Sequence, residues 1–355
     1  MTRRRMLALL AAGALPVSAR AAVVEAGRVL AFPRDHGAHL LARTEWWYVT
    51  GWLGTFERPQ AGFQVTFFRS RTGLAGGNAS RFAARQLLFA HAAVTDLSAG
   101  THRHAERIAR WSEAPGDALA GASLQDTSVH IGRWRLARDG SGYRAQVDDE
   151  AMVLDLALMP TQPLLLQGDA GFSRKGPQAQ QASHYVSEPQ LSVAGRWQRD
   201  GAELTGRAWL DHEWSDEFLH PDAVGWDWIG INLRDGSALT AFQLRRGDGT
   251  ALWAGGSFRR PGGPVQSFSP QDLRFEPGRR WASAATGARY PVQWTVHTPA
   301  GRFDVQALLD AQEMDGRAST GGVYWEGLSS VSDRLGPRVG LGYLEMTGYA
   351  GRLQL

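Results

Sequence analysis

The chain has 355 residues, with 42 glycines, 14 tryptophans, 14 phenylalanines and no cysteine. This length exceeds what a single core usually holds, so two domains are expected, and the many glycines fit a turn-rich, strand-rich protein better than a helical one. The lack of cysteine excludes a thiol nucleophile, a disulfide and a thiolate metal site, but a large exported protein does not need disulfides.

The first 21 residues have the three parts of a secretory signal peptide. Arg3–Arg5 form a charged start, Met6–Leu15 an apolar stretch, and Ala19-Arg20-Ala21 a cleavage site with small residues at its ends. The paired arginines resemble a twin-arginine signal, with an ordinary secretory signal as the alternative. The apolar stretch is shorter than the about 20 residues that span a bilayer. We therefore predict cleavage after Ala21 and a soluble mature protein in the periplasm or outside the cell.

Removal of this segment changes the net charge. The formal charge of the whole chain is +3, and residues 1–21 carry four arginines and no acidic residue, so the mature chain carries −1. No basic run is interleaved with aromatic residues. We therefore expect no nucleic-acid partner.

The mature chain consists of short segments with strand-like alternation, and 152–159 is the clearest because its apolar residues occupy every second position. The polar stretch His102–Gly121 and the segment Gly168–Ser183 are expected to be loops. The predicted strands are 44–53, 63–71, 86–96, 127–136, 143–148, 152–159, 191–197, 203–214, 226–233, 238–246, 252–259, 292–297, 303–309, 322–326 and 339–349.

This succession of strands and turns predicts an all-β protein built as sandwiches or barrels. Large aromatic and small residues alternate with polar ones, which suits a barrel with a lined interior, and about eight strands can enclose one small apolar ligand. The boundary is predicted near Ser187-Glu188-Pro189. It divides the mature chain into an N-terminal domain, 22–188, and a C-terminal domain, 189–355.

Three ionisable residues stand in a row within the aromatic stretch Gly206–Trp214. Asp211, His212 and Glu213 are costly to bury unless they are partnered, neutralised or used. In a strand, His212 and Trp214 would share one face, and Asp211 and Glu213 the other. Each acid then needs a partner from another strand. Either a hydrogen-bonded cluster that ties strands or domains together or a catalytic site satisfies this need.

Long motifs, most of them rich in tryptophan, run through nearly all of the mature chain. They are Glu45–Gly51, Phe89–Ala93, Gly206–Trp214, Gly225–Leu233, Tyr324–Gly327 and Gly340–Tyr343. These motifs resemble the AttH-like superfamily, which includes the carotenoid 1,2-hydratases (hydroxyneurosporene synthases) and many lipocalin-like "predicted secreted hydrolases". The resemblance implies two lipocalin-like (calycin) antiparallel β-barrel domains.

The resemblance also implies a chemistry for the central stretch. His212 and Trp214 match the His-x-Trp of the hydratases, where both line the cavity. Hydration of an isolated C=C bond needs an acid that stays protonated in an apolar pocket and aromatic faces that stabilise the cation by roughly 0.5–2 kcal/mol each. The following strand, Leu239–Leu244, lacks the Tyr and Asp of the hydratases. Their absence favours a binding protein over an enzyme.

We therefore expect an exported protein that binds an apolar, lipid- or isoprenoid-like ligand in an aromatic-lined cavity, with an envelope ABC-type transport system as a candidate partner. The alternatives are a hydratase and a secreted hydrolase, although the chain lacks the G-x-S-x-G and H-E-x-x-H motifs. No cofactor or metal site is predicted, because the His36/His39 and His102/His104 pairs lack acidic neighbours at ligand spacing. The candidate catalytic residues are Asp211, His212 and Glu213, and the candidate ligand-binding residues are Glu45, Trp47, His91, Trp214, Trp226, Trp228, Gln243 and Trp325.

Overall fold

A computed structural model describes residues 23–74, 80, 84–113, 116, 118–198, 201–334 and 336–353. The predicted signal peptide, 1–21, lies outside these residues. The described part consists of strands and turns, with two short 3-10 helices, η1 (Arg34–His36) and η2 (Pro270–Asp272). The all-β prediction is confirmed. None of the helices in the described ranges is long and apolar enough to cross a membrane.

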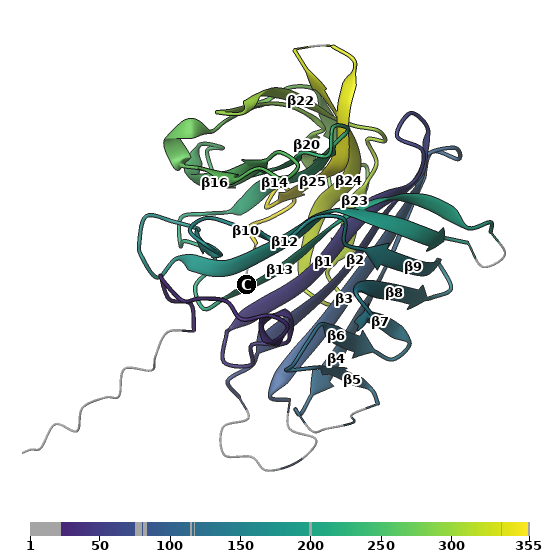
Figure 1. Ribbon diagram of the computed structural model, residues 1–355, viewed down its shortest axis with the longest axis vertical. Coiled ribbons are helices and arrows are strands. Elements are labelled where there is room, and N and C mark those ends of the chain that lie inside the picture. Colours follow the sequence, from purple (N-terminus) through teal and green to yellow (C-terminus); the bar gives the residue numbers. More distant parts are fainter. Residues whose placement is uncertain are drawn as a thin grey trace, which may run out of the picture.

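The first sheet is antiparallel and follows the order β4-β3-β2-β1-β13-β12-β9-β8-β7-β6-β5, with β10 and β11 also paired to β12. It forms the lower half of the molecule in Figure 1, coloured purple to teal. Its strands are β1 (Thr44–Gly54), β2 (Pro59–Arg71), β3 (Gln86–Asp96), β4 (Thr101–Trp111), β5 (Ala120–Ala122), β6 (Ser128–Ile131), β7 (Trp134–Asp139), β8 (Gly142–Asp148), β9 (Val153–Met159), β10 (Leu165–Leu166), β11 (Phe172–Arg174), β12 (Ala182–Arg196) and β13 (Leu204–Ser215).

The second sheet, green to yellow in Figure 1, follows the order β17-β16-β15-β14-β25-β24-β22-β21-β18, and β23 pairs with β24. A small separate sheet joins β19 to β20. Both large sheets curve, one into a nearly closed barrel and the other into a half-barrel. The strands are β14 (Gly225–Leu233), β15 (Ala238–Arg245), β16 (Ala251–Arg259), β17 (Val265–Phe268), β18 (Arg274–Pro277), β19 (Arg280–Ala282), β20 (Arg289–Pro291), β21 (Gln293–Thr298), β22 (Gly301–Ala307), β23 (Glu313–Gly316), β24 (Gly322–Asp333) and β25 (Arg338–Thr347).

The chain passes from the first sheet to the second between β13 and β14. The predicted domain boundary at residue 188 lies inside β12, which continues on both sides of it. Pro189 and Gln190 fall at a shift in the pairing of β12 with β13, and Gln190 has a φ of 59°. The proline signal in the sequence therefore marks an irregularity within a strand, as is usual for proline in a sheet.

The expectation of a loop over His102–Gly121 is wrong for its first half, which forms β4 (Thr101–Trp111). This strand lies at the edge of the first sheet, and most of its charged side chains are at least partly exposed. Charges on an edge strand discourage pairing with another molecule, and they also remove the apolar alternation that identifies strands in a sequence.

Each large sheet packs its own core, and a third core lies between the two sheets. Tyr48 and Trp209 of the first sheet meet Trp228 of the second in this inter-sheet core. The sheets approach closely at Gly62 of β2. A Cβ atom at Gly62 would lie 2.9 Å from both the Leu328 Cβ and the Tyr343 Oη.

Candidate functional site

The alternation predicted for the central stretch is confirmed in β13. Asp211 and Glu213 point to the face that meets the second sheet, where they line a cavity. His212 and Trp214 point to the opposite face, where they contact β1 and the segment that precedes it, residues 23–43, here called the lead-in segment. Neighbouring residues of one strand therefore belong to two separate clusters.

The cavity lies between the sheets and has about 110 Å³ of free space. That is enough for several waters or part of a small organic ligand. Its surface is mostly apolar and aromatic, yet it includes six buried or half-buried side chains that carry a carboxyl or amino group, Glu45, Lys175, Asp211, Glu213, Glu326 and Glu345. The aromatic lining residues are Trp46, Tyr48, Phe68, Tyr185, Phe218, Trp226, Trp228, Phe242 and Tyr324.

Asp211 accepts three hydrogen bonds. The donors are Tyr185 Oη at 2.6 Å, Ser187 Oγ at 2.5 Å and Trp209 Nε1 at 2.6 Å. Tyr185 Oη in turn accepts a bond from Trp228 Nε1 of the second sheet at 3.0 Å. Burial raises the pKa of Asp211 to about 7, although the three donors oppose this shift. Asp211 therefore ties β12 to β13, is linked to the second sheet through Tyr185, and changes its charge near neutral pH.

Glu326 of β24 and Glu345 of β25 are directly opposed in neighbouring strands. Burial raises the pKa of Glu326 well above its usual range, and the charge of Glu345 adds to this shift. Burial also raises the pKa of Glu345 to about 8, against a hydrogen bond from Trp226. Within the described residues, Glu326 Oε1 has no hydrogen-bond partner. Two carboxyl groups so close cannot both ionise in an apolar wall, so the pair carries at least one proton at neutral pH.

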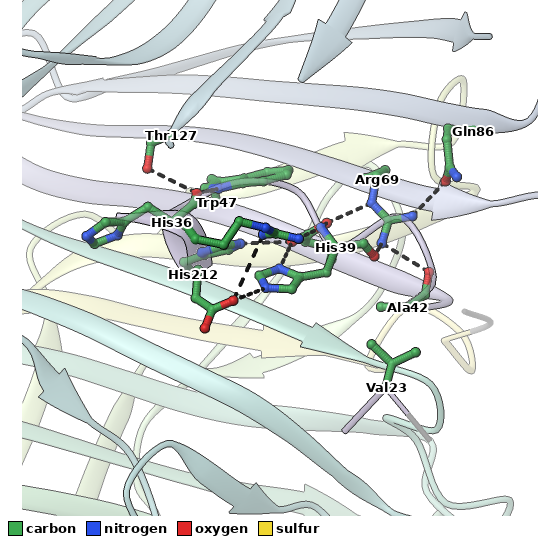
Figure 2. A network of polar contacts seen from close by, with 12 residues as sticks. Val23, His36, His39, Ala42, Trp47, Arg69, Gln86, Thr127 and His212 are labelled. Atoms are coloured by element: carbon green, nitrogen blue, oxygen red, sulfur yellow. Dashed lines mark hydrogen bonds and ion pairs between the residues drawn. The ribbon is translucent and has the colours of Figure 1, made fainter. Parts of the chain in front are cut away.

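The face of β13 opposite the cavity holds a second cluster, drawn in Figure 2. The buried Glu45 accepts hydrogen bonds from His39 Nδ1 at 2.8 Å and His212 Nε2 at 3.0 Å, and Arg69 Nε lies 2.7 Å from its other oxygen. Burial alone would raise the pKa of Glu45, but the Arg69 charge and the two histidines hold it well below its usual range. This cluster joins the lead-in segment to β1, β2 and β13.

Aromatic rings cover this cluster. Trp214 stacks on His39 with 3.6 Å between ring centroids, and Trp47 stacks on His212 at 4.8 Å. The facing atoms of His39, Glu45 and His212 lie within 4.8 Å of one another, which is the donor set of a metal site. Both carboxylates near His39 already have an arginine partner, since Arg69 pairs with Glu45 and Arg28 pairs with Asp35 at 2.8 Å.

A chain of hydrogen bonds links the cavity wall to the outside of the protein. Tyr324, which lines the cavity, lies 2.7 Å from His91 Nδ1, and Ser319 Oγ lies 2.7 Å from His91 Nε2. Ser319 also donates to the half-buried Glu106. Burial lowers the pKa of His91 to about 4, so its ring is neutral. A neutral ring accepts from one neighbour and donates to the other, which gives an unbroken path from Tyr324 to Glu106.

The predicted site residues therefore divide into groups. Asp211, Glu213, Trp226 and Trp228 line the cavity, and His91 reaches it through Tyr324. Glu45 also borders the cavity, but its carboxylate belongs to the cluster on the other face, with Trp47, His212 and Trp214.

Gln243 and Trp325 lie in the second sheet, where they make hydrogen bonds, and they do not line the cavity. Gln243 donates to Asp227 at 2.8 Å, and Trp325 Nε1 donates to the Asp310 carbonyl at 2.7 Å. Lys175, Glu326 and Glu345 line the cavity but are not among the predicted site residues. Two features of the sequence could have indicated Lys175 and Glu345. Lys175 is the only lysine in the chain, and Glu345 is a charged residue within the apolar segment Leu341–Met346.

Comparisons with known proteins agree with this architecture. A crystal structure of an AttH-like protein from Nitrosomonas europaea is 46% identical, covers 92% of this chain and 99% of that chain, and has a TM-score of 0.82. Kievitone hydratase from Nectria haematococca is 15% identical, with 92% and 98% covered and a TM-score of 0.64. CghA with Sch210972 is 13% identical, with 93% and 99% covered and a TM-score of 0.53. The last two likenesses show the fold alone.

No curated protein sequence matches the chain. The AttH-like family model matches residues 23–349, a range that includes both large sheets and every residue of the cavity wall. The match agrees with the resemblance of the tryptophan-rich motifs. The chain therefore belongs to the AttH-like family.

Proposed function

We propose that the inter-sheet cavity binds an apolar, unsaturated small molecule of isoprenoid type and that a carboxylic acid in its wall protonates that molecule. The observation that carries the proposal is the opposed pair Glu326 and Glu345, whose raised pKa values keep a proton inside an aromatic pocket at neutral pH. Buried carboxyl groups are costly, and an acid that stays protonated near pH 7 suits general acid catalysis.

The reaction that fits these groups is addition of water to a C=C bond. Protonation of one alkene carbon by the acid leaves a carbocation on the other, and water then attacks the cation and returns a proton to the carboxylate. Trp226 and Trp228 line the same cavity, and an aromatic face stabilises a nearby cation by roughly 0.5–2 kcal/mol. The likeness in fold to a protein named kievitone hydratase supports this choice of reaction only as an analogy.

The path from Tyr324 through His91 and Ser319 to Glu106 supports the proposal from another side. An acid in an enclosed pocket needs a way to exchange protons with water between turnovers. Each group on this path can accept a proton from one neighbour and release one to the next. The path begins on β24, the strand that also carries Glu326.

A carrier that binds an apolar ligand without converting it is the second candidate. Asp211 favours it, because its three hydrogen-bond donors are protein groups, and one of them, Tyr185, also accepts a bond from Trp228 of the second sheet. We also propose that the mature protein is exported and serves an envelope transport system. That proposal depends on residues 1–21 and on their resemblance to a twin-arginine signal.

The test uses purified mature protein, with farnesol as the ligand and N-phenyl-naphthylamine as a fluorescent apolar probe. In D2O we expect farnesol to displace the probe and to gain water with deuterium on carbon. Glu326→Gln should lower this turnover by at least about 100-fold and leave probe affinity unchanged, whereas the control Glu276→Gln, at a half-exposed residue outside the cavity wall, should change neither. Displacement of the probe without any deuterium on carbon would instead identify a carrier.

A further inference from the structure

Lysine is almost absent from this protein. The chain has 38 lysine and arginine residues, and Lys175 is the only lysine among them. A guanidinium therefore provides the positive charge at every other basic position. The single ammonium is also not at the surface, where lysine usually lies, because the Lys175 side chain is only 2% exposed.

Lys175 lies in the wall of the inter-sheet cavity. Its backbone follows β11 and is fixed by a hydrogen bond of 2.7 Å from its N–H to the Gln181 carbonyl. Its Nζ atom faces three aromatic rings that also line the cavity, those of Phe242 at 4.1 Å, Tyr185 at 4.6 Å and Phe218 at 5.3 Å. The amine is therefore surrounded by three aromatic rings and faces the cavity in which a ligand would bind.

The only charged partner within hydrogen-bonding distance of Nζ, among the described residues, is Glu213, whose Oε1 lies 2.8 Å away. Burial lowers the pKa of Lys175, and the negative charge of Glu213 opposes this shift. Burial raises the pKa of Glu213, and Lys175 opposes that shift in turn. Both shifts bring the pKa values of the two groups closer together, so transfer of the proton from the ammonium to the carboxylate costs less here than it would in water.

An arginine could form the same ion pair and stack on the same rings. What a guanidinium cannot do at neutral pH is lose its proton and attack carbon, whereas a desolvated lysine amine can. We propose that Lys175 forms a Schiff base with an apolar aldehyde or ketone bound in the inter-sheet cavity. The inference depends on the cavity accepting an apolar ligand, as the proposed function does, but not on protonation of an alkene.

The step balances without an oxidant or reductant. Glu213 takes a proton from the Lys175 ammonium, and the free Nζ attacks the carbonyl carbon to form a C–N bond. The carbonyl oxygen takes the proton held by Glu213, and a second proton from the nitrogen passes through the same carboxylate to that oxygen. The oxygen then leaves as water. The product is a protonated imine, and the Glu213 carboxylate is its counter-ion.

The other ligand that a buried ammonium could recognise is a carboxylate, such as a fatty acid. The cavity wall disfavours it, because Glu213 already neutralises the ammonium and a ligand carboxylate would lie beside the Glu213 carboxylate. A second anion would add like charge in a medium that screens little. A carbonyl group is neutral, and the protonated pair Glu326 and Glu345 can donate a hydrogen bond to its oxygen.

The single lysine makes the test specific. The mature protein is incubated with 3-phenylpropanal, an apolar aldehyde, and sodium cyanoborohydride, which reduces an imine to a stable secondary amine. We expect one adduct per chain, located on Lys175 by peptide mapping and formed at least about 10-fold faster than the adduct on the N-terminal amine. The probe N-phenyl-naphthylamine and the alcohol 3-phenylpropanol should slow it by competition.

Two variants complete the experiment. Lys175→Arg keeps the positive charge and should lose the adduct, and Glu213→Gln keeps the amine but should slow its formation at least about 10-fold. An adduct confined to the N-terminal amine, in protein that binds the probe, would overturn the Schiff-base proposal and leave the proposed function standing. Failure to bind either the probe or farnesol would overturn both. Peptide mapping of the unaltered chain decides the question even if a variant does not fold.

Discussion

Replacement of Asp211 by asparagine should make the stability of the protein less dependent on pH. The pKa of Asp211 rises from 3.8 to about 7 on folding, chiefly because the carboxyl is buried. Between these values the folded protein keeps a proton that the unfolded chain has lost, so the free energy of unfolding falls as the pH rises. Asparagine has nearly the same shape and can still accept from Ser187 and Trp209, but it does not titrate.

The size of the effect follows from the two pKa values. From about pH 5 to about pH 8, the shift of Asp211 removes roughly 2–3 kcal/mol from the free energy of unfolding. Urea unfolding at both pH values would measure this loss in the natural chain, and Asp211→Asn should reduce it by about that amount. Asp248→Asn is the control, because Asp248 is exposed with a lowered pKa and stays ionised throughout the range in both states.

Equal losses of stability in the natural chain and in Asp211→Asn would refute this reasoning. Such a result would mean that Asp211 is already ionised at pH 5, with its three donors stronger than the effect of burial. The same pair of proteins bears on catalysis. If Asp211 were the proton donor, Asp211→Asn would lose turnover of farnesol by at least about 100-fold, whereas the role of Glu326 predicts that turnover is largely retained.

Three further predictions concern other parts of the molecule. Trp214→Phe should lower the melting temperature without changing the affinity for N-phenyl-naphthylamine, whereas Trp228→Phe in the cavity wall should weaken that affinity. The opposite pattern would place the ligand at the cluster around Glu45. Glu45→Gln leaves its arginine partner buried without a counter-charge, and urea unfolding should show a loss of about 3–5 kcal/mol; a loss below about 1 kcal/mol would argue against the ion pair. N-terminal sequencing of periplasmic protein should begin at Ala22, and lysines in place of the Arg3-Arg4 pair should block export only by the twin-arginine route.

The alternation of apolar and polar residues predicts many strands of this protein and the faces to which their side chains point. Trp226–Leu233 was predicted from its own pattern, and β14 spans Gly225–Leu233. The division of β13 into a face with Asp211 and a face with His212 followed from the two-residue period alone. The same pattern does not identify β4, because side chains on both faces of this strand are at least partly exposed to solvent. Apolar and polar residues alternate only where one face of a strand is buried.

The composition of the cavity wall could not be predicted in the same way. Lys175, Glu213 and Glu326 come from three separated parts of the chain and from both sheets, and no local pattern records which strands of two sheets will face each other. The hydratase-like motif drew attention to His212 and Trp214, which belong to the cluster on the opposite face. Their neighbours Asp211 and Glu213 face the second sheet, as Trp209 does.

The close approach at Gly62 makes the height of the cavity depend on a residue outside its wall. A side chain of any size at position 62 would meet Leu328 and Tyr343, and it could be accommodated only if those side chains moved or the second sheet tilted away. The distance between the two sheets at this point therefore depends on the side chain at position 62, which in glycine is a single hydrogen atom. A larger residue at position 62 that moved the sheets apart would make room for a bulkier ligand, without a change in any residue that lines the cavity.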